Sequence, residues 1–400
     1  MKGCLHFHKY MKSLIALLFF FGLLLFSHPE IVSAAGEPAS DPSVLCLPGV
    51  YLLEPGSCNP AGPSTYLTDM AEKGITFPIK PLPAFKPEKS LTQVDFHYGI
   101  VRSENAPVYP SLEAAVDGNR KDAVRRIDSP FSYISYMDEA VVNGKRFYLL
   151  ESGAWMTAND IIRIGAFSQF QGLTLTSTPK NAFGWVLSYL SATPVETKRT
   201  PGYAKNDYTG HVLNQLEVVQ TYGEEKVNGE DWVMTGPDEW LPKRVVARVI
   251  PNTTPPTGVT GDRWIEVNLY EQTISVYDHN QLVYASIIAS GLEPLWTRPG
   301  LFQIYQKLDS TMMRGRFDDG SDSYYLEDVP WTMYFDEARA LHGAYWRANL
   351  GFAQSHGCVN MTVGDARWIF DWAKEGDWVY VWDPSGKTPT DPSAYTAGGA

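Results

Sequence analysis

The chain has 400 residues, a formal net charge of −12, and shares of hydrophobic (44%) and charged (20%) residues typical of a globular protein. This length is too great for one ordinary core and predicts two to four domains. The acidic balance argues against nucleic acid as a partner and against electrostatic docking on an anionic lipid surface, whereas it is compatible with a polymeric, zwitterionic or cationic substrate.

Residues 1–34 have the pattern of a signal peptide. Three lysines precede an uninterrupted apolar run, Leu14–Phe26, of 13 residues. A run of this length is short for a transmembrane helix, and the small residues before Ala35 fit a cleavage site. We therefore expect an exported protein, secreted or in the cell envelope, with no stable membrane span after processing. The alternative is an uncleaved membrane anchor.

Cleavage would remove Cys4 and leave three cysteines, of which Cys46 and Cys58 enclose eleven residues with Pro-Gly near both ends. A disulfide between them would close a short loop and contribute about 3 kcal/mol, and two buried thiols are the alternative. Residues 35–94 are rich in proline and show no sustained period, so we expect an extended segment there. Cys358 has no partner, and an unpaired cysteine in an oxidising compartment indicates a reactive thiol.

Residues 95–250 contain an internal repeat. "VNGKRFYLLESGAW" begins at Val142 and "VNGEDWVMTGPDEW" begins at Val227, so a tryptophan follows at the same spacing in both copies. Asn-Gly tolerates positive φ and therefore predicts the tip of a β-hairpin in each copy.

The two copies resemble small SH3-like barrels, with module 1 at residues 95–170 and module 2 at 171–250. Such modules are common in cell-wall enzymes, which implies binding to glycan or another wall polymer. In that case Trp155 and Trp240 would help to form a binding groove. The alternative, which the burial habits of aromatic residues favour, is that each tryptophan packs in the core of its own module.

A Pro/Thr-rich linker, residues 251–261, precedes a region with a different pattern. From residue 264, apolar and polar residues alternate across two turn candidates, which predicts a three-strand meander. A strand pair follows at "TRPGLFQIYQK", the one convincing helix covers 362–374, and "DWVYVW" predicts a last strand. We expect residues 384–400, rich in Pro, Ser and Gly, to be disordered.

Cys358 lies in the segment "SHGCVN", residues 355–360. A thiolate attacks a carbonyl carbon well, but it needs an imidazole to take its proton and N–H donors for the developing oxyanion. The backbone N–H groups of His356, Gly357 and Cys358 can supply these donors, because a glycine permits the turn and a close approach of substrate. Both His342 and His356 are candidates for the base, since spacing alone does not decide between them.

Three other histidines, His97, His211 and His279, lie in strand or turn contexts and are expected to be structural or solvated. A buried apolar cysteine without a chemical role is the alternative for Cys358.

The segment "HGAYWRANLGFAQSHGCVN" resembles the signature of the L,D-transpeptidases, the family with a YkuD-type catalytic domain. In that family a histidine and a short loop precede Ser/Thr-His-Gly-Cys, a hydrophobic residue, and Asn or Arg. "TRPGLF" is similar to the family's Thr-Pro-x-Gly-x-Phe, with Arg298 in place of the proline. The resemblance covers residues 262–383 and implies a β-sandwich with one main helix. The whole chain is then expected to be mainly β, with the two SH3-like barrels ahead of this domain.

The resemblance also implies roles for individual residues. Cys358 would be the nucleophile and His342 the general base and acid, with its ring oriented by the backbone carbonyl of Gly343. The amides from His356 to Cys358 would form the oxyanion hole. The expected pocket residues are Ser355, Trp346 and Asn360. For the tryptophan and the asparagine, the alternatives are local packing and turn formation.

The implied reaction is acyl transfer on peptidoglycan stem peptides. The thiol of Cys358 would attack the carbonyl of the third stem residue, D-alanine would leave, and the amine of a neighbouring stem would take the thioester to give a 3→3 cross-link. Water as the acceptor would make the protein an L,D-carboxypeptidase, and a lipoprotein lysine would make it an anchoring transferase. No cofactor or metal is implied, since the chain lacks H-E-x-x-H or paired C-x-x-C spacing.

Three other functions compete with this one. An NlpC-type endopeptidase has its cysteine before its histidine, whereas His342 precedes Cys358 here. A sortase needs an arginine on a strand soon after the cysteine, and the close one, Arg367, falls inside the predicted helix. A wall-binding protein with a decayed catalytic domain is disfavoured by the complete histidine and cysteine pair.

Overall fold

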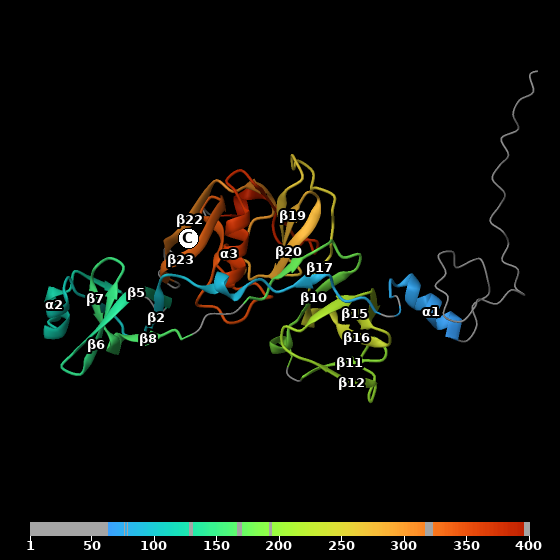
Figure 1. The fold of residues 1–400 in the computed structure, drawn as a ribbon, viewed down its shortest axis with the longest axis horizontal. Coiled ribbons are helices and arrows are strands. Elements are labelled where there is room, and N and C mark those ends of the chain that lie inside the picture. The colour runs from blue at the N-terminus through green and yellow to red at the C-terminus, as the bar shows by residue number, and fades with distance from the viewer. Residues whose placement is uncertain are drawn as a thin grey trace, which may run out of the picture. The chain divides into compact units, whose positions relative to one another are not determined.

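The computed structural model describes residues 63–395, except positions 76, 78, 128–130, 166–169, 192–193 and 317–322. The chain divides into two units, residues 1–68 and 69–400, and the fold below concerns mainly the second (Figure 1). The predicted signal peptide and the predicted Cys46–Cys58 disulfide lie outside the described residues. Among the described residues the fold is mainly β, with three α-helices.

The end of the predicted Pro-rich segment contains a helix, α1 (Pro63–Glu72), which its irregular sequence did not suggest. Met70 and Ile75 are buried against Trp232 and Trp240, so tertiary packing supports this part of the chain. Further along, β1 (Ala84–Phe85) pairs with β9 (Leu173–Leu175), and the short η2 (Lys89–Thr92) follows.

The first repeat forms a small β unit around its own core. Asn143 and Gly144 have φ values of 53° and 72°, and they turn the chain between β5 and β6 as the sequence predicts. Trp155 is partly buried beside Phe147 and Tyr109, which supports the packing role for this tryptophan. The elements are β2 (His97–Val101), β3 (Ala106–Val108), α2 (Leu112–Asp117), η3 (Arg120–Asp122), β4 (Arg125–Ile127), β5 (Phe131–Val142), β6 (Lys145–Leu150), β7 (Trp155–Thr157), η4 (Ala158–Asp160) and β8 (Ile161–Arg163).

The second repeat forms two sheets, with orders β13-β10-β17 and β12-β11-β16-β15-β14. Asn228 and Gly229, at φ 53° and 84°, form the predicted hairpin tip between β14 and β15. Trp240 is only 6% exposed, so it packs in a core and does not line an open groove. The elements are β10 (Ala182–Val186), η5 (Ser188–Leu190), β11 (Val195–Lys198), β12 (Tyr208–Leu213), β13 (Val218–Thr221), β14 (Gly223–Val227), β15 (Glu230–Gly236), β16 (Glu239–Pro242), η6 (Lys243–Val245) and β17 (Val246–Val249). That the two repeats are SH3-like barrels stays a prediction.

The C-terminal region packs two sheets around one helix. The predicted meander is present as β18 (Trp264–Asn268), β19 (Thr273–Asp278) and β20 (Gln281–Ile287), and β26 (Trp378–Trp382) pairs with β18 in parallel. The predicted helix is α3 (Val363–Trp372), which Thr362 caps by accepting from the N–H of Asp365. The remaining strands are β21 (Gly300–Gln303), β22 (Gln306–Arg316), β23 (Ser323–Asp336), β24 (Arg339–Gly343) and β25 (Val359–Met361).

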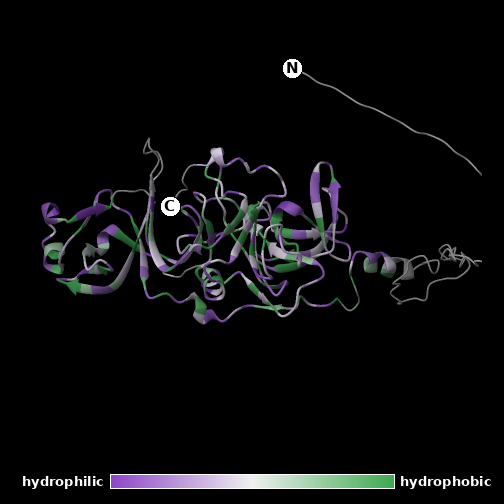
Figure 2. Cartoon of the chain, turned by 90° about the horizontal axis from the view of Figure 1, so that it is seen from above, coloured by the Kyte–Doolittle hydropathy of each residue, from purple (hydrophilic) through white to green (hydrophobic). Residues whose placement is uncertain are grey.

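Burial holds these layers together. In Figure 1, α3 lies between β22/β23 and β19/β20, and one buried cluster joins residues of both sheets to the helix. Figure 2 shows hydrophobic and hydrophilic segments interspersed along the strands. Strands β18 and β24 are buried at every position, as expected for strands covered on both faces. At about 25 cal/mol per Å² of apolar surface, this burial is the main stabilising contribution to the domain.

The first repeat and the C-terminal region share a sheet. Strand β5 pairs in parallel with β23, with Phe131 opposite Tyr324 and Tyr133 opposite Leu326. Similarly, β9 pairs with β20 and extends the C-terminal sheet, although its residues fall within predicted module 2. The predicted linker, 251–261, contains no strand and connects β17 of the second repeat to β18 of the C-terminal region.

The predicted disordered tail, 384–400, is described as far as residue 395. Asp383 accepts hydrogen bonds from the backbone N–H groups of Ser385 and Thr388, and the short η7 (Pro392–Ala394) follows. The ring of Tyr395 lies 5.2 Å from the guanidinium of Arg339. This part of the tail is therefore turned back and packed, because local carboxylate caps and a cation–π contact hold it.

Candidate active site

Strand pairing brings the two halves of the sequence motif together. Strands β24 and β25 are parallel neighbours, with His342 directly opposite Asn360. Cys358 lies two residues before that asparagine, at the end of the turn that leads into β25. The loop of residues 344–358 therefore returns the chain to the strand beside the histidine.

Most of the predicted site residues line one small pocket, of about 30 Å³. Gly343 and Gly357 do not line it, and they act through the backbone. Residues on other strands complete the wall. The pocket is lined by the predicted residues His342, Trp346, Ser355, His356, Cys358 and Asn360, together with Phe131, Met313, Tyr324, Leu326 and Arg347.

The imidazole of His342 is 1% exposed, and its Nδ1 lies 3.2 Å from the carbonyl oxygen of Gly343. A carbonyl oxygen only accepts, so Nδ1 carries the proton and Nε2 holds the lone pair. Burial lowers the pKa of His342 to about 4; the Gly343 carbonyl opposes this shift and the charge of Arg347 adds to it. The ring is thus neutral near pH 7, and Nε2 carries the lone pair.

The thiol of Cys358 is buried among Met313, Tyr324, Leu326 and other apolar side chains. Burial raises its pKa to about 11, although the N–H of Ala340 and the charge of Arg339 both lower it. Its Sγ lies 3.7 Å from the carbonyl oxygen of Ala338. The resting pair is therefore a neutral thiol and a neutral imidazole, so attack on a carbonyl requires transfer of the thiol proton.

The Ser-His-Gly-Cys turn is closed by its own serine. The hydroxyl of Ser355 donates to the carbonyl of Cys358 at 2.5 Å and accepts from the N–H of Gly357 at 3.2 Å. Gly357 has a φ of 119°, a conformation that L side chains rarely adopt, which explains the glycine. The ring of His356 lies 4.9 Å from the ring of Tyr324. Of the three predicted oxyanion donors, the Gly357 N–H is therefore already occupied in the resting state, since it donates to the Ser355 hydroxyl.

The "TRPG" segment supports this turn from outside. Thr297 is buried, and its hydroxyl donates to the carbonyl of Gly357 at 2.7 Å. Arg298, which stands where the resembling family has proline, forms an ion pair with Asp336. The segment thus stabilises the Ser-His-Gly-Cys turn that contains Cys358.

The other predicted pocket residues pack around the histidine. The ring of Trp346 lies 5.7 Å from that of His342 and meets Tyr345 edge-on at 4.8 Å. The amide nitrogen of Asn360 lies 3.3 Å from Nε2 of His342. Both residues therefore contact the proposed base directly.

The histidines expected to be structural or solvated lie elsewhere. His211 pairs with Glu239 at 3.0 Å, His279 pairs with Asp278 at 2.9 Å, and His97 packs on a tyrosine ring. None of these three lines the pocket that holds Cys358.

Sequence reasoning missed five residues of the pocket wall. Phe131 and Tyr324 come from strands that are far apart in the chain, and no local signal marks them. Arg347 could have been found, since it directly follows Trp346 within the motif and is the one basic residue between the histidine and the serine.

Comparison with known proteins gives a family match over the region that contains this site. Residues 262–381 match the sequence model of the YkuD family, described as the L,D-transpeptidase catalytic domain. These residues form an L,D-transpeptidase catalytic domain. L,D-transpeptidase 1 of Mycobacterium tuberculosis is 28% identical over 171 residues, which cover 38% of this chain and 65% of that protein. YciB of Bacillus subtilis (strain 168) is 25% identical over 120 residues, which cover 27% of this chain and 59% of that protein.

The matches thus span less than two thirds of the length of these relatives. Among solved structures, the catalytic domain of the E. faecium L,D-transpeptidase is 27% identical, over 31% of this chain and 100% of that one, with a TM-score of 0.28. An L,D-transpeptidase from Mycobacterium smegmatis covers 53% of this chain and 89% of that one, at 16% identity and a TM-score of 0.29.

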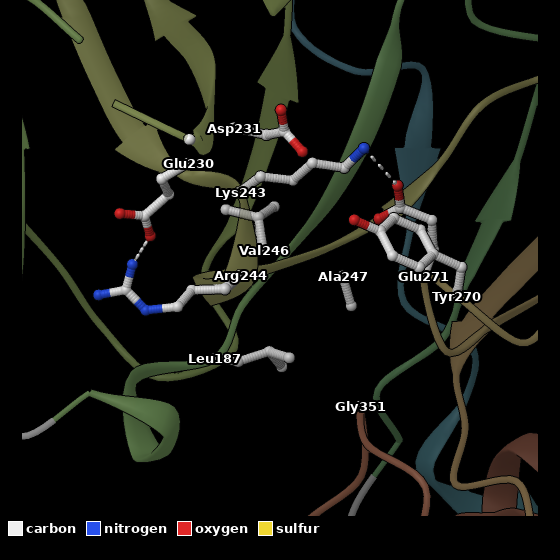
Figure 3. Close-up of a pocket in the computed structure, with 11 residues that line it drawn as sticks. Leu187, Glu230, Asp231, Lys243, Arg244, Val246, Ala247, Tyr270, Glu271 and Gly351 are labelled. Atoms are coloured by element: carbon white, nitrogen blue, oxygen red, sulfur yellow. Dashed lines mark ion pairs between the residues drawn. The ribbon is translucent and has the colours of Figure 1, made fainter. Parts of the chain in front are cut away.

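A larger cavity, of about 470 Å³, lies outside the site of the L,D-transpeptidase domain. The β14/β15 hairpin, η6 and the Tyr270-Glu271 turn contribute to its wall (Figure 3). Its basic residues are already neutralised, because Lys243 pairs with Glu271 and Arg244 pairs with Glu230. No predicted site residue lines this cavity, so it does not take part in the chemistry of Cys358.

Neither a membrane-spanning helix nor a metal-binding group was found in the part of the chain that the structure describes. None of its helices is both long enough and apolar enough to cross a bilayer. Its His, Cys, Asp and Glu side chains form no group of three or more that could hold a metal ion.

Proposed function

We propose that this protein is an exported, cysteine-dependent L,D-transpeptidase that forms 3→3 cross-links between peptidoglycan stem peptides. The observation that carries the proposal is that Cys358 and a neutral His342 line one pocket, with Nδ1 of the ring held by the Gly343 carbonyl. The domain match at residues 262–381 supports the reaction class. The N-terminal sequence pattern supports export, and the two repeats would contact glycan or another wall polymer.

In the first half-reaction, Nε2 of His342 takes the proton of the Cys358 thiol as Sγ bonds to the carbonyl carbon of the third stem residue. Backbone N–H groups from His356 to Cys358 stabilise the oxyanion, and that of Gly357 leaves the Ser355 hydroxyl to do so. The C–N bond to D-alanine then breaks, the imidazolium protonates the leaving amine, and a thioester remains on Cys358.

In the second half-reaction, the side-chain amine of another stem attacks the thioester carbonyl and passes its proton to His342. The C–S bond breaks, and the departing sulfur recovers that proton as a thiol. The imidazole thus serves as base and acid in turn, in a triad whose third member is a backbone carbonyl. Ser355, Trp346 and Asn360 would shape the substrate pocket.

The test is to incubate the protein without residues 1–34 with disaccharide-tetrapeptides and to weigh the products. Loss of D-alanine with a dimer mass supports the proposal, whereas loss of D-alanine with gain of water indicates an L,D-carboxypeptidase. Cys358→Ala should abolish product while wall binding is retained. Wall binding without any product from the unmodified protein would indicate a non-catalytic binding protein and overturn the proposal.

A further inference from the structure

Arg347 is a partly buried arginine whose charge no carboxylate balances among the described residues. Its three hydrogen bonds within the described part of the chain go to neutral groups. Nε donates to Oδ1 of Asn360 at 2.7 Å, and the two terminal nitrogens donate to the side chain and the carbonyl of Gln354 at 2.8 and 2.7 Å. Burial lowers its pKa to about 10, and the nearby Tyr133 hydroxyl opposes that shift. Burying a cation without a counterion costs free energy, so such a residue needs a reason.

The contact with Asn360 determines which way the asparagine amide faces. A guanidinium offers only donors, so the atom of Asn360 that meets it must be the carbonyl oxygen. The amide nitrogen is then directed to the opposite side, where it lies 3.3 Å from Nε2 of His342. An N–H donor at this place is compatible only with a ring whose Nε2 carries a lone pair.

The other end of the ring agrees with this assignment. Nδ1 of His342 lies 3.2 Å from the carbonyl oxygen of Gly343 and must donate to it. Every donor thus meets an acceptor along the series Gln354, Arg347, Asn360, His342 and Gly343. If the amide of Asn360 were turned over, its oxygen would face Nε2 and favour a proton there, and a protonated Nε2 cannot accept the proton of a thiol.

We propose that Arg347 is a positioning residue, which acts through Asn360 to keep Nε2 of His342 unprotonated, the state that acceptance of the Cys358 thiol proton requires. The inference rests on the proposed function for its catalytic meaning, whereas the state of the ring can be measured without substrate. In this role Arg347 is not itself the general base, and it need not contact substrate. Gln354 holds the guanidinium in place from the opposite side.

The first test is ¹⁵N NMR of the histidine rings in the folded protein and in Arg347→Met, at neutral pH and without substrate. Wild-type protein should show His342 protonated at Nδ1 only. The variant should show protonation at Nε2, either as the other tautomer or as an imidazolium. An unchanged His342 signal in a folded variant would overturn the inference. Arg367→Met, which removes an arginine from α3 outside the pocket, is the matched control.

The second test is steady-state release of D-alanine. Arg347→Met should lower kcat by roughly 10²-fold, the lower end of what a positioned base contributes, with KM nearly unchanged. An arginine that instead binds a substrate carboxylate would raise KM and be rescued by Arg347→Lys. That result would overturn the inference, because a lysine lacks the planar fork that holds Gln354 and Asn360 together.

The third test asks whether the effect passes through the asparagine. Adding Arg347→Met to Asn360→Ala should cause little further loss of kcat, since coupled residues are not additive. Full additivity would overturn the inference.

If Arg347→Met does not fold, Gln354→Ala releases the guanidinium more gently and should shift the His342 signal in the same direction. If the wild-type protein makes no product but Arg347→Met still changes the His342 signal, the proposed function is rejected and the positioning role is retained.

Discussion

His342 and Asn360 lie opposite each other on the parallel strands β24 and β25, with the asparagine amide nitrogen 3.3 Å from Nε2 of the ring. The site therefore keeps its base between two hydrogen-bonding groups, the Gly343 carbonyl on one side and this amide on the other. The carbonyl fixes the ring proton on Nδ1, and burial keeps the ring neutral. A neutral base and a neutral thiol in one pocket have measurable consequences.

The first prediction concerns the reactivity of Cys358. Because burial raises the pKa of its thiol to about 11, the thiolate fraction is small at pH 7 and should rise about tenfold per pH unit. The rate of Cys358 alkylation by iodoacetamide should therefore climb from pH 7 to pH 10 without a plateau. A plateau below pH 8 would indicate a preformed thiolate–imidazolium pair and would contradict the resting state described above.

The second prediction concerns stability at low pH. His342 has a pKa of about 4 in the folded state against 6.5 unfolded, so between these values the unfolded state binds more protons and stability falls as pH falls. The difference corresponds to about 3 kcal/mol. Wild-type protein should lose about that much more unfolding free energy between pH 7 and pH 4 than His342→Asn, measured by urea denaturation. His279→Asn, which replaces an exposed histidine outside the pocket, is the control.

The third prediction concerns Glu266, a buried carboxyl on β18 that accepts from Nε1 of Trp382 at 2.9 Å. Burial raises its pKa to about 7, so the folded state binds the extra proton and stability is lost as pH rises from 4.5 through 7. Glu266→Gln keeps the acceptor and removes the charge. It should raise the unfolding free energy at pH 8, by up to about 3 kcal/mol, and have little effect at pH 4. An equal effect at both pH values would contradict this, and exposed Glu225→Gln is the control.

The fourth prediction concerns Gly357. Alanine there would adopt a φ of 119° and bring its Cβ to 3.3 Å from Nε of Arg339. Backbone strain of this kind costs about 1–3 kcal/mol. Gly357→Ala should lower Tm and also change the alkylation rate of Cys358, since the turn positions that thiol. Gly376→Ala, at φ 94° with open space around it, should lower Tm without changing that rate. Equal alkylation rates in both variants would contradict a role of the turn.

The fifth prediction concerns the first repeat, which supplies Phe131 to the pocket wall by pairing β5 with β23. Phe131→Ala should raise KM for a stem-peptide substrate and leave kcat nearly unchanged, because the ring lines the pocket wall and offers no group for proton transfer. Val141→Ala, on an exposed position of the same strand, is the matched control. Identical KM values for both variants would show that the first repeat does not contribute to substrate binding.

Local sequence patterns predicted the elements whose signals lie within a few residues. The two Asn-Gly tips, the meander from residue 264 and α3 were all found, because turn chemistry and hydrophobic period depend on neighbouring positions. The same patterns missed α1, whose residues Met70 and Ile75 are ordered by packing against tryptophans far along the chain. They also placed β9 in the second repeat, although it pairs with β20.

The candidate site divides in the same way. The cysteine, its turn and the histidine sixteen positions earlier were visible in the chain. The turn residues indicated a nucleophile with amide donors, and the resemblance to the L,D-transpeptidase signature favoured His342 over His356 as the base. Pairing of β24 with β25, closure of the wall by Phe131, burial of the thiol and the contact from Arg347 to Asn360 arise only in the folded molecule. The physical reason is that a period of two identifies a strand but not its partner, and burial, which sets both pKa values, depends on which strands meet.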